Sequence, residues 1–405
     1  MREDGLAELQ AAGFAWTVGD RSPRPAKADP PGPGDMVGVQ LVSGDVQFTA
    51  FGTVTWADGS RFLAFGHPFL GLGTVELPVT GARVVADVAS LQRGFKLASV
   101  TDPVGVILQD RPAGVYGRFD ERARMLDVVV EVGAPGLKNT RLNFQVIRHP
   151  QLTPALLAGA FATAWTSVED STSLRTVRLS SIVLQTEKGD TVKLKDQAFS
   201  GPQSFVTAAE YLSGVVDLLE NNPHEAVLLR SLRFETEIRP GIRSSQVETA
   251  WLDRDALRPG EPLNVSVRLQ PQQAPARVVT VEVPTRDLPA GPALLWIGNA
   301  LEVAKKVAAS GKDLPRSGVQ YEDYLSRLPS DEALAVAIAS QSPGAILQRT
   351  RVGDLPPSVA ALMSRAPGAQ AAPQASSRTV GLIQLPGTGL VDGVLEVPFQ
   401  VEDAP

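Results

Sequence analysis

The chain has 405 residues, enough for two or three domains with cores of their own, and its composition is that of an ordinary globular protein. The formal net charge is −6, with acidic and basic residues interspersed, so no basic stripe offers a footprint for nucleic acid. The absence of cysteine excludes disulfides and thiolate chemistry. The three histidines, His67, His149 and His224, lie far apart, so we expect no metal and no other cofactor.

Residues 1–33 begin with a short candidate helix, Leu6 to Ala12, and continue into a segment dense in proline. Proline at this density blocks regular structure and is typical of a linker, which favours a connection to something upstream. Met1 is not followed by the apolar region of a signal peptide. No run reaches the roughly 18 apolar residues of a spanning helix, so we expect no membrane span in this chain.

Residues 34–150 carry a β pattern throughout, in which short apolar or alternating runs are separated by Gly, Pro, Asp or Asn. We expect strands over residues 36–42, 46–56, 61–65, 84–90, 96–100, 104–109, 114–119, 125–132 and 140–147. Strands this short and this regularly spaced favour an antiparallel barrel or sandwich over βαβ units.

The stretch from Gly52 to Phe69 predicts a β-hairpin that ends at a histidine. Two β-prone runs flank Ala57-Asp58-Gly59-Ser60, which is a turn signal. Gly66 ends the second run, and Pro68 cannot donate to a ladder, so His67 is expected where a strand breaks. A rigid sheet can hold a catalytic or binding side chain at such a place. A surface or half-buried histidine that fixes a loop by one hydrogen bond explains the same pattern.

Three aspartates of this domain are candidates to orient the His67 imidazole by accepting a hydrogen bond from one ring N–H: Asp87, Asp102 and Asp110. Asp102 and Asp110 both resemble turn residues, whereas Asp87 lies inside an expected strand. Because a triad is defined by geometry rather than by order along the chain, the sequence leaves the choice among them open.

The glycines around the histidine, Gly66, Gly71 and Gly73, have two interpretations. They could let backbone N–H groups approach an oxyanion. A loop that needs positive φ angles explains them equally well.

The string G-T-x-T-aromatic followed by A-F-G-H resembles the peptidase domain of the SpoIVB-type (stage IV sporulation protein B) serine peptidases. The resemblance runs from Pro33 to Phe119, includes the segment Gln109 to Gly117, and is closest to that domain in larger, non-sporulation bacterial proteins. It implies a chymotrypsin-like β-barrel, an extracytoplasmic location (periplasm, envelope or secreted) and a protein or peptide as substrate or partner. It also implies that His67 is the general base.

The family's nucleophile motif, of the type G-x-S-G-S-P, occurs nowhere in the sequence. A histidine without its serine cannot run acyl transfer, because the base has nothing to activate. One hypothesis is therefore peptide-bond hydrolysis in which a missing upstream segment, lost in a fragment or a late-start gene model, supplies the serine. The other is an inactive envelope scaffold that keeps the peptidase fold and binds a peptide or protein at a sheet edge.

Residues 151–229 are expected to extend the β-domain with two helices and a hairpin. The helices are predicted over residues 154–166 and 205–219, from apolar side chains at helical spacing. The hairpin is predicted over residues 175–184 and 191–194, across Glu187-Lys188-Gly189-Asp190.

The remaining chain divides, by pattern, into four pieces. Residues 230–297 resemble an immunoglobulin-like β-sandwich. Residues 298–365 are expected to form short helices over 301–309, 320–328 and 331–340. Residues 366–378, rich in Ala, Pro, Gln and Ser, predict a flexible linker, and residues 379–405 predict a closing hairpin.

Overall fold

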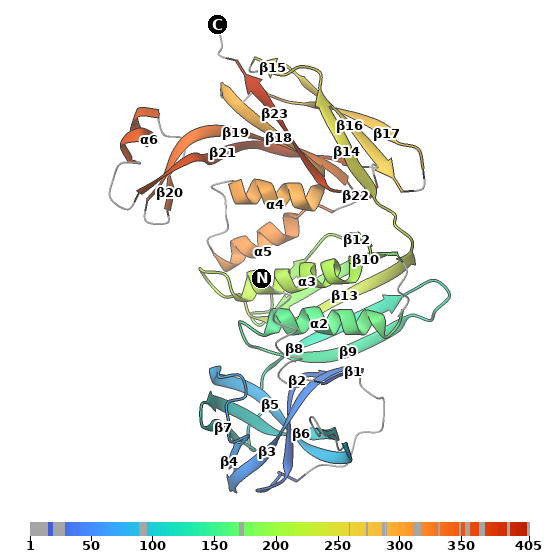
Figure 1. Ribbon diagram of the computed structural model, residues 1–405, viewed down its shortest axis with the longest axis vertical. Coiled ribbons are helices and arrows are strands. Elements are labelled where there is room, and N and C mark those ends of the chain that lie inside the picture. The colour runs from blue at the N-terminus through green and yellow to red at the C-terminus, as the bar shows by residue number, and fades with distance from the viewer. Residues whose placement is uncertain are drawn as a thin grey trace. The chain divides into compact units, whose positions relative to one another are not determined.

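The computed structural model describes residues 15–18, 29–88, 95–169, 174–258, 260–272, 274–285, 288, 290–310, 317–330, 333–347, 350–352, 357–363, 369–386 and 389–402. The protein is mainly β, with several sheets and a few helices, as the sequence predicts (Figure 1). It divides into two compact units. The first comprises residues 1–172, 181–193 and 203–239, and the second comprises residues 173–180, 194–202 and 240–405.

Six strands of the first unit close into a ring. They are β2 (Met36–Gly44), β3 (Val46–Asp58), β4 (Arg61–Ala64), β5 (Gly73–Val88), β6 (Phe95–Arg111) and β7 (Gly114–Arg118). Each pairs antiparallel with its neighbours in the order β2-β3-β4-β7-β6-β5, and β5 pairs with β2 again. Closure leaves these strands without a free edge within the ring.

The ring is filled by the inward residues of its strands, which alternate with exposed residues. In β4, for example, Phe62 and Ala64 are buried, whereas Arg61 and Leu63 are exposed. Phe62 is fully buried and stacks on Phe119 with ring centroids 4.5 Å apart. Its register partner on β7 is Gly117, where an added Cβ would lie 2.3 Å from both the Phe62 ring and the Val106 carbonyl oxygen. Only glycine therefore lets β7 approach this closely.

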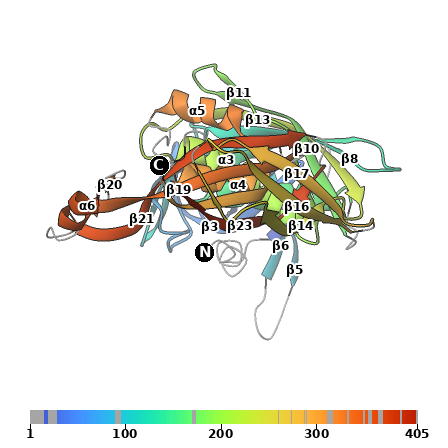
Figure 2. The same ribbon diagram turned by 90° about the horizontal axis from the view of Figure 1, so that it is seen from above.

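The distal parts of β5 and β6 leave the ring. Residues 82–88 of β5 pair with residues 95–100 of β6, and in the described part of the chain they form a two-stranded arm (Figure 2). The sequence predicted two short strands in place of β6, and it missed the first half of β5. The reason is that Pro78 and Pro103 lie inside these strands, and proline argues against a strand; Pro103 pairs with Thr80, where the register of the ladder shifts.

The sheet continues from β2 through β9 (Thr140–Ile147), β8 (Met125–Gly133), β13 (Leu229–Pro240), β10 (Arg175–Thr186) and β11 (Thr191–Lys193). β13 runs parallel to β8, whereas the pairs β2–β9, β8–β9 and β10–β11 are antiparallel. β1 (Ala15–Val18) pairs with β3, and β12 (Gln197–Gly201) pairs with β10.

The helices α2 (Thr153–Thr166) and α3 (Ser204–Glu220) lie side by side over this part of the sheet (Figure 1). Both helices are confirmed within a residue of the expected ends. The aromatic stripe of α2 is core: Phe161 meets the Phe234 ring at 5.1 Å, and Trp165 is fully buried. The Trp165 indole Nε1–H donates to Thr236 Oγ1 at 3.0 Å, which satisfies its polar atom inside the core.

Two charged side chains, Glu220 and Arg148, hydrogen-bond to the backbone N–H and C=O of Leu229 at the start of β13. Glu220 Oε1 accepts from the Leu229 N–H at 3.0 Å, and Arg148 donates to the Leu229 carbonyl oxygen and pairs with Glu187. Burial raises the pKa of the Glu220 carboxyl, and the nearby Glu187 carboxylate adds to this, against the lowering effects of the Leu229 N–H and Arg148. Folding therefore makes the Glu220 carboxyl harder to ionise than it is in the unfolded chain.

We expect Glu220→Gln to become more stable relative to the native chain as the pH rises. A carboxyl whose folded pKa lies above its unfolded value contributes stability that is lost as the pH rises through the folded pKa, whereas glutamine does not titrate. Urea unfolding of both chains at about pH 4 and about pH 8 measures the difference. The exposed Glu131→Gln is the control, and an E220Q effect of equal size at both pH values would contradict this role of burial.

The second unit contains two sheets. The first, in the order β17-β16-β14-β22, is built from β14 (Ser245–Leu252), β16 (Leu263–Pro271), β17 (Arg277–Val283) and β22 (Val391–Asp392). The second has the order β15-β23-β18-β19-β20, with β21 on β19. Its strands are β15 (Ala256–Leu257), β18 (Gly291–Asn299), β19 (Ala333–Leu347), β20 (Thr350–Val352), β21 (Ala369–Pro386) and β23 (Val394–Val401).

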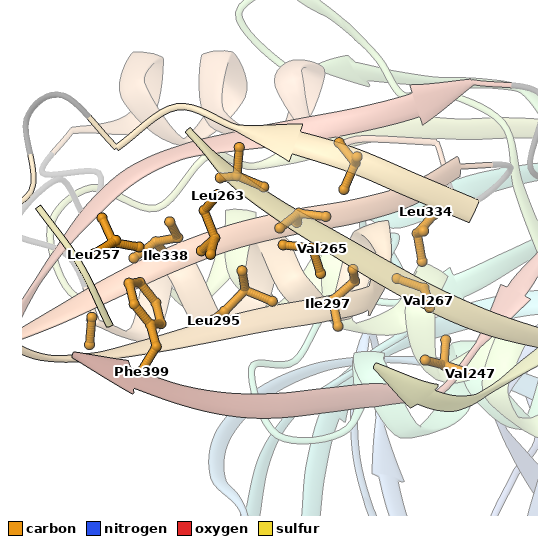
Figure 3. Close-up of a cluster of buried hydrophobic side chains, with 14 of the residues drawn as sticks. Val247, Leu257, Leu263, Val265, Val267, Leu295, Ile297, Leu334, Ile338 and Phe399 are labelled. Atoms are coloured by element: carbon orange, nitrogen blue, oxygen red, sulfur yellow. The ribbon is translucent and has the colours of Figure 1, made fainter. Parts of the chain in front are cut away.

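The two sheets share one buried core. Val265 and Val267 of β16 face Leu295 and Ile297 of β18, and Phe399 of β23 closes one side (Figure 3). The helix α4 (Ala300–Ser310) packs on the other face of β18 and β19, where the buried side chains include Trp296, Ala300 and Ala335. The helices α5 (Gly318–Arg327) and α6 (Pro357–Met363) complete the described elements.

Three expectations for the second unit are wrong. Residues 331–340 were expected as a helix, but Ala333 onward is β19, because leucine, valine and isoleucine alternate with alanine at period two. Most of the expected linker 366–378 lies in β21, which is held by pairing with β19. The expected closing hairpin does not form: β21 pairs with β19, and β23 pairs with β18 and β15.

Two other expectations concern this region. Residues 231–238, expected in the sandwich, belong to β13 of the first unit's sheet. The helices expected over 301–309 and 320–328 are confirmed as α4 and α5, and Ser317 caps α5 by accepting from the Gln320 N–H at 3.4 Å. No helix in the described part of the chain is both long enough and apolar enough to cross a membrane.

Candidate functional site

His67 lies in the loop that joins β4 to β5, residues 65–72, at one end of the six-stranded ring. β4 ends at Ala64, and the backbone then takes positive φ angles at Phe65 (74°) and Gly66 (69°). Two such residues in succession turn the chain out of the ladder. The expectation that His67 follows the end of a strand is confirmed, and Figure 1 shows β4 and β5, the two strands that this loop joins.

The His67 side chain is exposed, and one hydrogen bond sets its protonation pattern. Nδ1 lies 2.7 Å from the carbonyl oxygen of Pro68. A carbonyl oxygen can only accept, so Nδ1 carries the proton in the neutral ring and Nε2 keeps its lone pair. The edge of the ring meets Phe65 at a centroid distance of 5.7 Å, and Phe65 meets Phe69 at 5.6 Å, both in T-shaped contacts. The imidazole therefore presents a basic Nε2 atom.

Asp110, the last but one residue of β6, hydrogen-bonds to the backbone of this loop. Its side chain is 1% exposed, and its register partner is Gly73 at the start of β5. Oδ1 accepts from the Phe69 N–H at 2.7 Å, and Oδ2 accepts from the N–H groups of Leu70 at 2.8 Å and Leu72 at 3.1 Å. Three backbone donors satisfy the buried carboxylate, which is the arrangement that a buried charge requires.

The three candidate aspartates have different places. Asp110 reaches the His67 loop, but through the backbone rather than through the imidazole. Asp102 is half-buried within β6, away from the ring end that carries β4 and β7. Asp87 lies in the β5 arm opposite Lys96, and its side chain lies outside the described residues. Among the described residues, none of these carboxylates hydrogen-bonds to His67.

The glycines of the loop adopt the conformation that the second interpretation expected. Gly66, Gly71 and Gly73 have φ angles of 69°, 70° and 80°, a region that side chains with a Cβ rarely occupy. The N–H groups of Phe69, Leu70 and Leu72 point at Asp110, so these three donors are not available to an oxyanion. The positive φ angles are thus sufficient to account for glycine at these three positions.

The other two histidines lie on different elements. His149 precedes α2: its N–H donates to Thr153 Oγ1 at 2.8 Å, its Nδ1 accepts from the Gln151 N–H at 3.3 Å, and burial lowers its pKa. His224 lies in the turn after α3, where its N–H donates to Asn222 Oδ1 at 3.0 Å. Among the described residues, no group of three or more His, Asp and Glu side chains is placed to hold a metal ion.

Sequence reasoning missed how Asp110 acts. The signal available was an aspartate at the end of a β-run, followed by a Pro-Ala-Gly turn, which predicts a turn residue. Its three backbone donors come from residues about forty positions earlier in the chain, and no local pattern connects the two segments.

No protein-family model, curated protein or solved structure matches this chain.

Proposed function

We propose that this chain is a SpoIVB-type serine peptidase-like protein in which His67 is the general base of an acyl-transfer site. One observation carries the proposal: Nδ1 of His67 donates to the Pro68 carbonyl, so the exposed Nε2 atom is the one that can accept a proton. The loop that carries it is fixed by a buried carboxylate, which keeps the base in one position.

The closed six-stranded antiparallel ring supports a chymotrypsin-like β-barrel for the first unit. The two sheets around one core support an immunoglobulin-like sandwich for the second. The stretch from Pro33 to Phe119 resembles the histidine-bearing part of the family's peptidase domain, which supports this site and favours an extracytoplasmic location.

In the proposed reaction, Nε2 takes the proton of a serine hydroxyl while that oxygen attacks the carbonyl carbon of a peptide. The protonated imidazole then donates to the leaving amine, and water releases the acyl group in a second round. Because the sequence contains no G-x-S-G-S-P motif, the serine is supplied by another segment or another chain.

One observation favours an alternative function, a catalytically inactive scaffold that binds a peptide or protein. Both oxygens of Asp110 are committed to backbone N–H groups, and in the described part of the chain no carboxylate contacts the His67 imidazole. A serine-peptidase base normally has such a partner on Nδ1, where this chain has a carbonyl.

An activated ester separates the two functions. We expect the chain to cleave p-nitrophenyl acetate faster than the same concentration of free imidazole does, because Nε2 is exposed, keeps its lone pair in the Nδ1–H ring and attacks the acyl carbon itself. His67→Gln should remove most of this excess rate, while His224→Gln, at another exposed histidine, should retain it.

If His67→Gln leaves the rate unchanged, Nε2 is not an available base, and the binding function stands in place of the peptidase-like one. Labelling by a fluorophosphonate probe that disappears in a Ser→Ala variant would show instead that a serine of this chain is the nucleophile.

A further inference from the structure

The peptide group between Pro68 and Phe69 lies between Asp110 and His67 and bonds to both. Its carbonyl oxygen accepts from His67 Nδ1–H at 2.7 Å, and its N–H donates to Asp110 Oδ1 at 2.7 Å. The described residues contain no cis peptide bond, and in a trans peptide the C=O and N–H vectors point in opposite directions. The two hydrogen bonds therefore form one chain, from imidazole through amide to carboxylate.

The two bonds strengthen each other. A carboxylate that accepts from an amide N–H draws positive charge toward the nitrogen side and leaves the carbonyl oxygen more negative, which makes it a better acceptor for Nδ1–H. The orientation of this peptide plane is also restrained. Pro68 fixes its own φ angle and limits the backbone of His67, and Asp110 Oδ2 holds the next turn through Leu70 and Leu72.

Rotation of this peptide plane would break both hydrogen bonds. The Phe69 N–H would leave a carboxylate that is 1% exposed, and the Pro68 carbonyl would leave the imidazole. Asp110 thus selects the one orientation in which His67 holds its proton on Nδ1.

We propose that Asp110 is a positioning residue for His67 and acts through the Pro68–Phe69 peptide group, so that an amide is interposed where a serine-peptidase triad has a direct carboxylate–imidazole bond. The consequence is a His67 ring locked in the Nδ1–H tautomer, with Nε2 as the base. This inference rests on the proposed function for its catalytic meaning, while the tautomer itself can be measured without any activity.

Nitrogen-15 NMR of the full chain tests it, because ring ¹⁵N shifts distinguish a protonated from an unprotonated imidazole nitrogen. The chain has only three histidines, and His67→Gln identifies the signals of interest. At a pH where the ring is neutral, we expect His67 in the Nδ1–H form. In Asp110→Asn, the ratio of the Nδ1–H to the Nε2–H form should fall about tenfold, the equivalent of one ordinary hydrogen bond.

Asp45→Asn is the matched control. Asp45 Oδ2 also accepts one backbone N–H, from Asn143 at 2.7 Å, but it lies in the turn between β2 and β3. That variant removes the same charge and should leave the His67 tautomer unchanged. A folded Asp110→Asn chain with unaltered His149 and His224 signals, in which His67 stays in the Nδ1–H form, would overturn the proposal.

The native chain alone provides a second measurement if Asp110→Asn does not fold. An Nε2–H tautomer at His67, or fast hydrogen exchange at the Phe69 amide, would refute the interposed amide. The ester assay separates this inference from the proposed function. If His67 is in the Nδ1–H form but ester cleavage does not depend on His67, Asp110 keeps its positioning role and His67 is not the general base. If cleavage depends on His67 but the ring is not held in the Nδ1–H form, the proposed base stands and the positioning role of Asp110 is refuted.

Discussion

Asp110→Asn is expected to lower the free energy of unfolding by about 3 kcal/mol, because three backbone donors converge on the two carboxylate oxygens and an amide can accept on only one side. If the amide oxygen takes the place of Oδ2, the NH₂ group meets the Phe69 N–H; in the other orientation, it meets Leu70 and Leu72. Either way a buried donor faces another donor, with no change in side-chain volume. Urea unfolding followed by far-UV circular dichroism measures the loss.

Asp45→Asn should cost less than about 1 kcal/mol in the same assay, since its single backbone bond is exposed to water. Equal losses in the two variants would mean that the Asp110 contacts contribute no more than one exposed hydrogen bond. The loop would then be held by its glycines and its aromatic contacts instead.

Gly117→Ala is expected to destabilise the first unit by about 3 kcal/mol or more, because the new methyl has nowhere to go. It would lie 2.3 Å from the Val106 carbonyl oxygen, which is backbone of the neighbouring strand, and 2.3 Å from the Phe62 ring. Relief requires that β7 separate from β6 or that Phe62 leave its stack on Phe119. The loss is measured as a decrease in the urea midpoint at constant m-value.

Gly214→Ala provides the opposite result from the same chemical change. Gly214 lies inside α3 with nothing within 4 Å of an added Cβ and with an ordinary φ angle. Alanine should stabilise the helix by roughly 0.5–1 kcal/mol. Similar effects at the two glycines would contradict the close strand approach that the ring shows at Gly117.

The site differs from a serine-peptidase triad in what each part contacts. Asp110 is buried, His67 is exposed, and one peptide group lies between the two side chains. In the proposed function, a serine brought from elsewhere would need only to reach Nε2, because the tautomer is already set within the chain.

Local patterns were sufficient for much of the fold. The turn at Ala57-Asp58-Gly59-Ser60 separates β3 from β4 as predicted, since Asp and Gly carry their turn preferences wherever they occur. The helices α2 and α3 followed from apolar spacing and a proline at the first turn. The exposed break at His67 followed from Gly66 and Pro68 for the same reason.

The local sequence was not sufficient to predict the structure of residues 333–339, which lie in strand β19. Ser330 as a candidate N-cap, followed by Asp331 and Glu332 in the first turn, predicts a helix over residues 331–340. In the folded protein Leu334, Val336 and Ile338 enter the core between the two sheets, while Ala335, Ala337 and Ala339 face α4. Both faces of the strand are buried, and only the neighbours decide which side chain size each face accepts.

The sequence by itself determined the mainly β character, the hairpin and the strand break at His67, because each depends on conformational preferences of a few adjacent residues. Tertiary structure alone decided which aspartate contacts the loop of His67, and through which atoms. Closure of the ring brings the end of β6 beneath the β4–β5 loop, and the contact runs through backbone N–H groups. Every residue except proline carries a backbone N–H, so the identity of a residue does not indicate which acceptor its N–H will bond to.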